Sequence, residues 1–136
     1  RRDRWNALYR AMEDGLRATP ALRLIDRPAA ETYVGSSFQF LLPDWPAEAV
    51  EALLSRCAAR GVEIKWFGAD QPVAFTSRHD HWAYLPRQPL PQTDRILAGL
   101  IDLRLPLTFT PDDSAQIARI VRAEVSAVWQ GLAGAA

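Results

Sequence analysis

Residues 36–67, SSFQFLLPDWPAEAVEALLSRCAARGVEIKWF, decide the fold class. The run 37–42 is apolar and aromatic and ends at a proline, which is typical of a strand. Apolar residues then return at three- and four-residue spacings, which predicts an amphipathic helix. Gly61 would end that helix, because glycine adopts the left-handed turn conformation without strain. Residues 62–66 alternate apolar with charged side chains, so the whole stretch predicts a strand–helix–strand unit.

The middle helix of this unit has a recognisable start in the Asp44-Trp45-Pro46 sequence. We expect the Asp44 carboxylate to cap the helix and Pro46 to lie in its first turn. The single cysteine of the chain, Cys57, lies on the apolar face of this helix. We therefore expect a buried, unreactive thiol and not a nucleophile.

The segment 1–18 predicts a first helix, because its apolar side chains recur at helical spacings. A short extended piece around Leu24 follows it. At the other end of the chain, residues 131–136 read GLAGAA, a run of small residues that we expect to fray.

Residues 93–130 predict a second unit, helix–strand–helix. Thr93 would cap a short helix that reaches Leu100, and the leucines within 103–107 alternate as in a strand. The last helix would begin at Thr110, with acidic residues at its positive end. Together the elements predict an α+β fold, with a small, largely antiparallel sheet of three to four strands and helices packed on one face.

Composition limits the classes of partner. The chain has 136 residues, enough for one domain, and its 49% hydrophobic and 24% charged residues are typical of a globular protein. Sixteen basic residues balance sixteen acidic ones, so charge gives no reason to expect nucleic acid or an anionic membrane as a partner. No apolar run is long enough to span a bilayer, and one cysteine agrees with a reducing compartment, so we expect a cytoplasmic protein.

The beginning of the sequence is unusual. It starts at Arg1, and its one methionine, Met12, lies within the first predicted helix. We expect from this that the sequence is a piece of a longer polypeptide.

The long segment 68–92 holds both histidines and a Ser-Arg pair among aromatic residues, with no clear periodicity. Loops of this length are usually functional or disordered, and the aromatic content argues against disorder. Ser77 and Arg78 could line a pocket for an anionic or planar ligand, because an arginine suits a carboxylate or phosphate. The aromatic residues that could line it with them are Trp66, Phe67, Phe75, Trp82 and Tyr84. The alternative is that the loop only packs its aromatic side chains into the core.

His79 and His81 are two residues apart and would face the same side of an extended segment. Two imidazoles could chelate a divalent metal, but a zinc site needs a further ligand, and no residue nearby supplies one at a familiar spacing. We expect hydrogen-bonding histidines and no metal.

Several motifs in order resemble a known family. They are the strand run 36–43, the segment 60–68 after a helix, the Leu-Pro-Gln-Thr-Asp segment 90–94, and the segment 102–107 before a final helix. In this order and spacing they resemble the C-terminal small domain of the DegT/DnrJ/EryC1/StrS aminotransferases, over nearly the whole chain. The portion 75–79 resembles only a subgroup of that family.

The resemblance implies a fold-type-I transaminase that uses pyridoxal phosphate to move an amino group from an amino acid to a carbonyl acceptor, often a nucleotide-linked keto sugar. In this family the lysine that bonds the cofactor, and the phosphate-binding residues, lie in a large domain that precedes the small one. No position here matches them, so the resemblance implies no catalytic residue in this segment and no activity of the segment alone. The only lysine, Lys65, alternates with apolar residues of its predicted strand, and we expect it to face solvent.

The resemblance also implies a role for the loop. A fold-type-I small domain closes over the active site, so Arg78, Ser77, His79 and Trp66 would contact a small-molecule substrate held by the large domain of the same polypeptide, in a homodimeric enzyme. A second interpretation stays open. The chain could be a stand-alone, non-catalytic α+β module that binds a small molecule or a protein.

Overall fold

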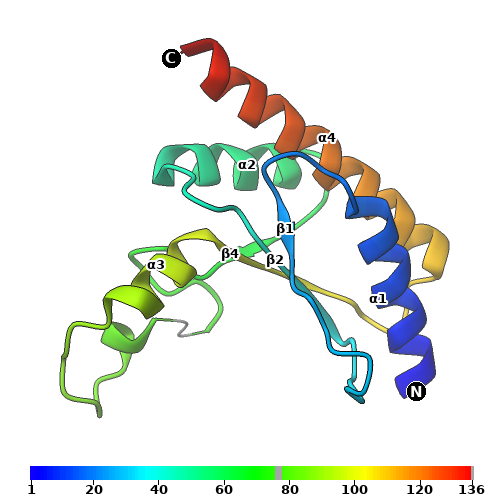
Figure 1. Ribbon diagram of the computed structural model, residues 1–136, viewed down its shortest axis with the longest axis horizontal. Helices are drawn as coiled ribbons and strands as arrows, with labels where there is room; N and C mark the ends of the chain where they lie inside the picture. The colour runs from blue at the N-terminus through cyan, green and yellow to red at the C-terminus, as the bar shows by residue number, and fades with distance from the viewer. Residues whose placement is uncertain (76–77, 136) are drawn as a thin grey trace.

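A computed structural model describes residues 1–75 and 78–135. It contains four helices and four strands, which alternate irregularly along the described chain (Figure 1). The helices are α1 (Arg2–Leu16), α2 (Ala47–Ala59), α3 (Pro91–Gly99) and α4 (Pro111–Ala135), with a 3-10 turn at His79–His81. The strands are β1 (Arg23–Leu24), β2 (Ser37–Leu41), β3 (Lys65–Trp66) and β4 (Leu100–Arg104).

The four strands form one sheet in the order β1-β2-β4-β3, and every neighbouring pair is antiparallel. The longest ladder joins β2 to β4, with Phe38 opposite Leu103 and Phe40 opposite Ile101. All four of these side chains are buried, and they form one face of the sheet. The prediction of an α+β fold with a small antiparallel sheet is confirmed.

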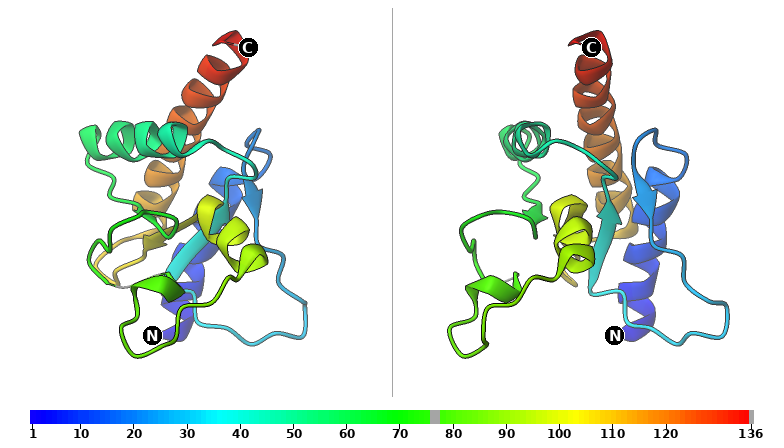
Figure 2. Two further views of the ribbon diagram at one scale, coloured as in Figure 1. Left: turned by 90° about the vertical axis from the view of Figure 1, so that its left-hand side faces the viewer. Right: turned by 60° about the vertical axis from the view of Figure 1, so that its left-hand side comes forward.

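Helices α1, α2 and α4 cover this apolar face, whereas α3 lies apart from them, next to β3 (Figure 2). The first and last helices lie side by side and at close range, because Gly15 faces Ala118. A Cβ atom on Gly15 would lie 2.5 Å from the Cβ of Ala118, so only glycine allows this approach. The buried core sits between these helices and the sheet.

The end of α2 agrees with the sequence prediction. Gly61 has φ +78°, the N–H of Gly61 donates to the carbonyl of Ala58 at 2.9 Å, and the N–H of Val62 donates to that of Cys57 at 2.9 Å. This pair of hydrogen bonds is a Schellman motif. Because the chain is still leaving the helix at Val62, β3 is shorter than the predicted 62–66 and pairs with β4 only at Lys65 and Trp66.

The start of α2 differs from the prediction. Asp44 makes no capping hydrogen bond; it has φ +58°, and its carboxylate accepts a hydrogen bond from Arg95 at 3.2 Å. Pro46 is itself the residue that precedes the first helical turn. The prediction that Asp44 caps the helix is wrong, because the left-handed backbone at Asp44 turns its side chain towards α3.

The boundaries around β4 also differ. The helix α3 begins at Pro91, so Thr93 lies inside it and does not cap it. The helix ends at Gly99, since the N–H of Leu42 donates to the Gly99 carbonyl at 2.9 Å and Leu100 already belongs to β4.

The helix α4 begins next to Thr110, as predicted, and Thr110 caps it. The Thr110 hydroxyl oxygen accepts a hydrogen bond from the Asp113 N–H at 3.2 Å, and the Asp113 carboxylate accepts one from the Thr110 N–H at 2.8 Å. This capping box lowers the pKa of Asp113 through the hydrogen bond from the Thr110 backbone. At its other end the helix extends to Ala135, and Trp129 stacks on Trp45 with ring centroids 5.9 Å apart.

Candidate functional site

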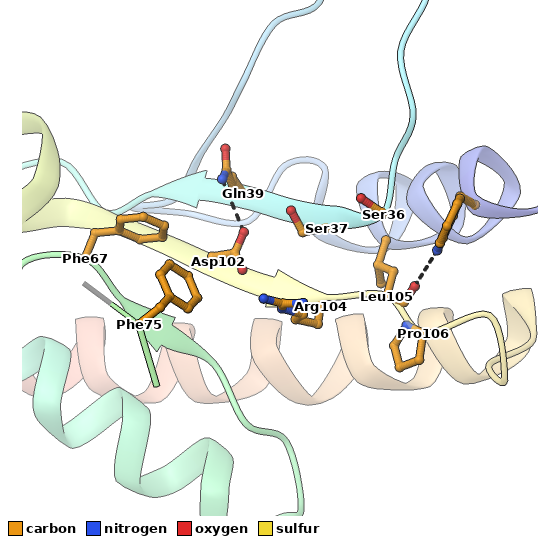
Figure 3. A pocket seen from close by; sticks show the side chains of 10 residues that line it. Ser36, Ser37, Gln39, Phe67, Phe75, Asp102, Arg104, Leu105 and Pro106 are labelled. Carbon is orange, nitrogen blue, oxygen red and sulfur yellow. Dashed lines mark hydrogen bonds between the residues drawn. The ribbon is translucent and has the colours of Figure 1, made fainter. Parts of the chain in front are cut away.

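The face of the sheet opposite the helical core is polar. Side chains on this face alternate with the buried ones: Ser37 and Gln39 come from β2, Asp102 and Arg104 from β4, and Lys65 from β3. The register places Gln39 and Lys65 on either side of Asp102. A concave pocket of about 560 Å³ lies over this face (Figure 3). It is lined by Trp5, Ser36, Ser37, Gln39, Phe67, Phe75, Asp102, Arg104, Leu105 and Pro106.

Asp102 lies at the centre of the pocket floor. The residue is only 6% exposed, although it carries a carboxylate. The side-chain amide of Gln39 donates a hydrogen bond to one carboxylate oxygen at 3.2 Å (Figure 3). Among the residues that the structure describes, no other side chain donates to it. A carboxylate accepts about four hydrogen bonds, so Asp102 keeps unused acceptor capacity.

Phe75 closes one side of the pocket, and two cations hold its ring. The Lys65 ammonium lies 3.9 Å from the ring centroid and the Arg104 guanidinium carbon 5.9 Å from it. The same ammonium donates hydrogen bonds to the backbone carbonyls of Val73 and Phe75, the latter at 2.9 Å. Burial lowers the pKa of Lys65, and the nearby Asp102 carboxylate opposes that change. Lys65 therefore fastens the segment 73–75 over the sheet.

The predicted contact Arg78 has partners inside its own loop. Its guanidinium forms a two-pronged pair with Asp80, at 3.0 Å from Nε and 2.8 Å from Nη2, and Nη1 lies 3.3 Å from Asp70. These bonds raise the pKa of Arg78, chiefly through the hydrogen bond to Asp80, and lower that of Asp80 for the same reason. Arg78 thus neutralises carboxylates of the loop in this arrangement.

The two histidines have separate partners. Nε2 of His79 lies 2.7 Å from the Asp94 carboxylate on α3, and Nε2 of His81 donates to the Asp70 carbonyl at 2.9 Å. Within residues 1–75 and 78–135, no group of three or more metal-ligating side chains is close enough to hold a metal ion. The His79 bond instead ties the loop to α3.

The other two predicted contacts lie elsewhere. Trp66 is 9% exposed and its indole N–H donates to the carbonyl of Ala98 at 2.9 Å, so it faces the core side of the sheet. Ser77 lies outside the described residues. The substrate contacts predicted at Arg78, Ser77, His79 and Trp66 stay a prediction.

The pocket residues that the sequence analysis missed are Gln39, Asp102 and Arg104. Asp102 stands between Ile101 and Leu103, and Gln39 between two phenylalanines, so each is a single polar residue on an otherwise apolar strand. That pattern could have indicated a polar second face of the sheet. It was not recognised at Asp102 because the strand was expected to begin only at Leu103.

The residues of this chain do not fit pyridoxal phosphate by themselves. The cofactor needs a lysine that can form a Schiff base, and the one lysine of the chain has its ammonium bonded to two backbone carbonyls beneath Phe75. In the described part of the chain no other side chain could take this role, since its remaining cations are arginines and histidines.

Comparisons with known proteins give matches to solved structures only. No family model matches the sequence, and no curated protein matches it. The structure is similar to aminotransferase TlmJ from Streptoalloteichus hindustanus, with a TM-score of 0.74 and 21% identity over 93% of this chain and 32% of that chain. The fold is that of part of an aminotransferase.

Two further solved structures agree. DesI, solved in the presence of its TDP-sugar product, has a TM-score of 0.67 at 19% identity and covers 89% of this chain and 30% of that one. For 3-amino-5-hydroxybenzoic acid synthase the TM-score is 0.64 at 21% identity, over 91% of this chain and 33% of that one. The chain therefore spans about a third of the length of each.

The predicted likeness to aminotransferases is confirmed at the level of the fold. Membership of the DegT/DnrJ/EryC1/StrS family stays a prediction, because identities near a fifth show the fold alone. None of the helices that the structure describes is both long enough and apolar enough to cross a membrane.

Proposed function

We propose that this chain is a domain of a pyridoxal phosphate-dependent aminotransferase, one that moves an amino group from an amino acid to a carbonyl acceptor, with a keto sugar as the acceptor. One observation carries the proposal: the fold match to TlmJ covers 93% of this chain but only 32% of that aminotransferase. A match to about a third of an aminotransferase supports a domain that works together with a larger domain of the same enzyme. Fold alone does not fix function, so the proposal needs a chemical test.

In this proposal the cofactor and its lysine belong to a large domain of the same polypeptide. Lys65 does not suit that role, because its ammonium is bonded to carbonyls in the pocket wall. The cofactor, when bound to the large domain, supplies the electron sink for amino transfer. The present chain would close over the active site of a homodimeric, cytoplasmic enzyme.

The polar face of the sheet is the best candidate for the side that closes. The opposite face is already covered by α1, α2 and α4, and the pocket lies on the remaining face. Substrate contacts at Arg78, Ser77, His79 and Trp66 stay part of this proposal. The bonds of Arg78 to Asp80 and of His79 to Asp94 favour a role in holding the loop in shape.

The test is to isolate the polypeptide that contains this chain at its native length from source cells. We expect a protein several times heavier than 15.2 kDa with the visible absorbance of bound pyridoxal phosphate, which changes when an amino donor is added alone. A protein of 15.2 kDa without cofactor would contradict the proposal. It would instead favour a stand-alone binding module, for which the pocket is available.

A further inference from the structure

We propose that the turn 73–75 is a gate between two cavities of this domain, and that the Lys65 ammonium holds the gate closed. When the gate opens, the pocket on the polar face of the sheet joins a second cavity beside β3. The inference does not rest on the proposed function, because it concerns access to the cavities and not the chemistry inside them.

A single side chain fastens the gate to the rest of the fold. Nζ of Lys65 donates to the carbonyls of Val73 and Phe75, the latter at 2.9 Å, and lies 3.9 Å from the centroid of the Phe75 ring. Within residues 1–75 and 78–135, every hydrogen bond that leaves the turn 73–75 goes to this ammonium. Loss of that one charged group would therefore release the three residues together.

The backbone of the closed gate is strained. Ala74 has φ +66°, and the Phe75 N–H donates to the Val73 carbonyl at 2.8 Å, which closes a three-residue turn. A turn of this kind with a positive central φ is rare and strained, and a residue with a Cβ adopts it less readily than glycine. Such a conformation persists where its surroundings impose it. Here Lys65 imposes it, because its ammonium binds the carbonyls on both sides of Ala74.

The contacts that close the gate suit a lysine and not an arginine. An ammonium is a compact charge with three donors on a flexible stem, so it can meet two carbonyls and an aromatic face at once. A guanidinium is planar and directs its donors in a fixed fork. The chain has fifteen arginines and one lysine, and that lysine stands at this position.

Phe75 is a wall shared by the two cavities. The second cavity, of about 370 Å³, has Phe75, Asp102 and Arg104 in common with the first and extends past β3 to Leu54 of α2. Figure 3 shows the Phe75 ring next to Arg104 at the side of the first pocket. Phe75 is 40% exposed and Val73 is 65% exposed, so the turn can move outwards without disturbing the buried core.

The alternative is that the turn 73–75 is a fixed wall. A fixed wall opens only when the whole domain unfolds, whereas a gate opens locally while the sheet stays intact. Amide hydrogen exchange distinguishes the two, because it reports the opening of each segment separately.

The first measurement is hydrogen exchange of the native-length protein, followed by mass spectrometry. Lys65→Met keeps a long side chain and removes the charge, and it should speed exchange in 73–75 about tenfold or more. Exchange in the paired strands β2 and β4 should not change. Phe75→Leu removes only the ring that the ammonium contacts, so it should give a smaller rise of about threefold.

The second measurement is entry of an apolar probe. N-phenyl-1-naphthylamine is uncharged and fluoresces in apolar surroundings, so the lost charge of Lys65 does not itself attract or repel it. It should bind Lys65→Met about tenfold more tightly than the parent, since the opened gate joins the two cavities. Arg122→Met is the matched control, because it removes an exposed cation on α4, away from the turn, and should change neither measurement.

Three results would overturn the inference. Unchanged exchange in 73–75 of Lys65→Met would show that the ammonium does not hold the turn. An equal rise in β2 and β4 would show that Lys65 supports the whole fold and that no separate gate exists. Faster exchange without tighter probe binding would show that the turn does not control access to the cavities.

Neither result for the gate depends on the cofactor. A native-length protein without pyridoxal phosphate would contradict the proposed function, and the effects of Lys65→Met on exchange and probe binding would still be expected. If the cofactor is present and these effects are absent, only the gate is wrong.

Discussion

Glu124 joins α4 to α2 through two arginines, and its neutralisation should weaken the fold measurably. The Glu124 side chain is 8% exposed, and its carboxylate lies 2.6 Å from Nε of Arg56 and 2.8 Å from Nη1 of Arg60. The hydrogen bond from Arg60, followed by that from Arg56, lowers the pKa of Glu124 against the opposing effect of burial. Both arginines are about half exposed, so solvent screens part of the attraction.

Glu124→Gln keeps the shape of the side chain and removes its charge. Exposed pairs contribute up to about 1 kcal/mol and fully buried ones about 3–5 kcal/mol when broken, so an arrangement with one buried partner should cost about 1–2 kcal/mol. For a domain of this length that corresponds to a fall in melting temperature of about 3–7 °C. Urea and thermal unfolding followed by circular dichroism, at about neutral pH, measure both quantities.

The pH dependence separates charge from packing. Because the pKa of Glu124 is lower in the folded state than its ordinary value of 4.5, its contribution is fully present above 4.5 and is lost as the pH falls through the folded-state pKa. The difference between parent and Glu124→Gln should therefore shrink in acid. A difference below about 0.3 kcal/mol at neutral pH, or one that does not change with pH, would refute the reasoning. The exposed Glu51→Gln on α2 is the matched control and should change stability little.

Three further predictions concern backbone contact, thiol chemistry and capping. Gly99→Ala would place a Cβ 2.5 Å from the carbonyl oxygen of Leu42, so we expect a loss of about 2–3 kcal/mol in urea unfolding; a cost below 0.5 kcal/mol would contradict that contact. Burial raises the pKa of the Cys57 thiol to about 11. Iodoacetamide should therefore not alkylate Cys57 in the folded chain at about pH 8, but should alkylate it in urea. Equal alkylation rates in both states, measured by mass spectrometry, would show that the thiol is accessible. Thr110→Ala removes the cap of α4 and should cost about 1 kcal/mol, whereas Thr110→Ser should restore most of it; equal stability of the two variants would exclude a capping role.

Local patterns were sufficient where neighbours along the chain decide the structure. The unit from β2 through α2 to β3 follows from apolar spacing and from Gly61, whose positive φ needs no information from elsewhere in the fold. The cap at Thr110 is equally local, because its partner is only three residues away. In these places the sequence prediction and the structure agree.

The sequence predictions are wrong where a contact between residues far apart in the sequence determines the local structure. Asp44 looks like a helix cap in the sequence, but its carboxylate pairs with Arg95, about fifty residues away. The start of β4 depends on the contact between Gly99 and Leu42, which no local pattern reveals. The pocket residues could not be predicted from the sequence for the same reason, since Gln39 and Asp102 become neighbours only through the pairing of β2 with β4.

The close contact of α1 with α4 has a consequence for how the chain folds during synthesis. Gly15 and Ala118 are about a hundred residues apart in the sequence, and no local event can bring them together. The apolar face of the sheet stays partly uncovered until α4 has emerged from the ribosome and reached α1. A ribosome-stalled chain that ends before Pro111 should therefore remain open to proteases, and it should become resistant only once the last helix is available.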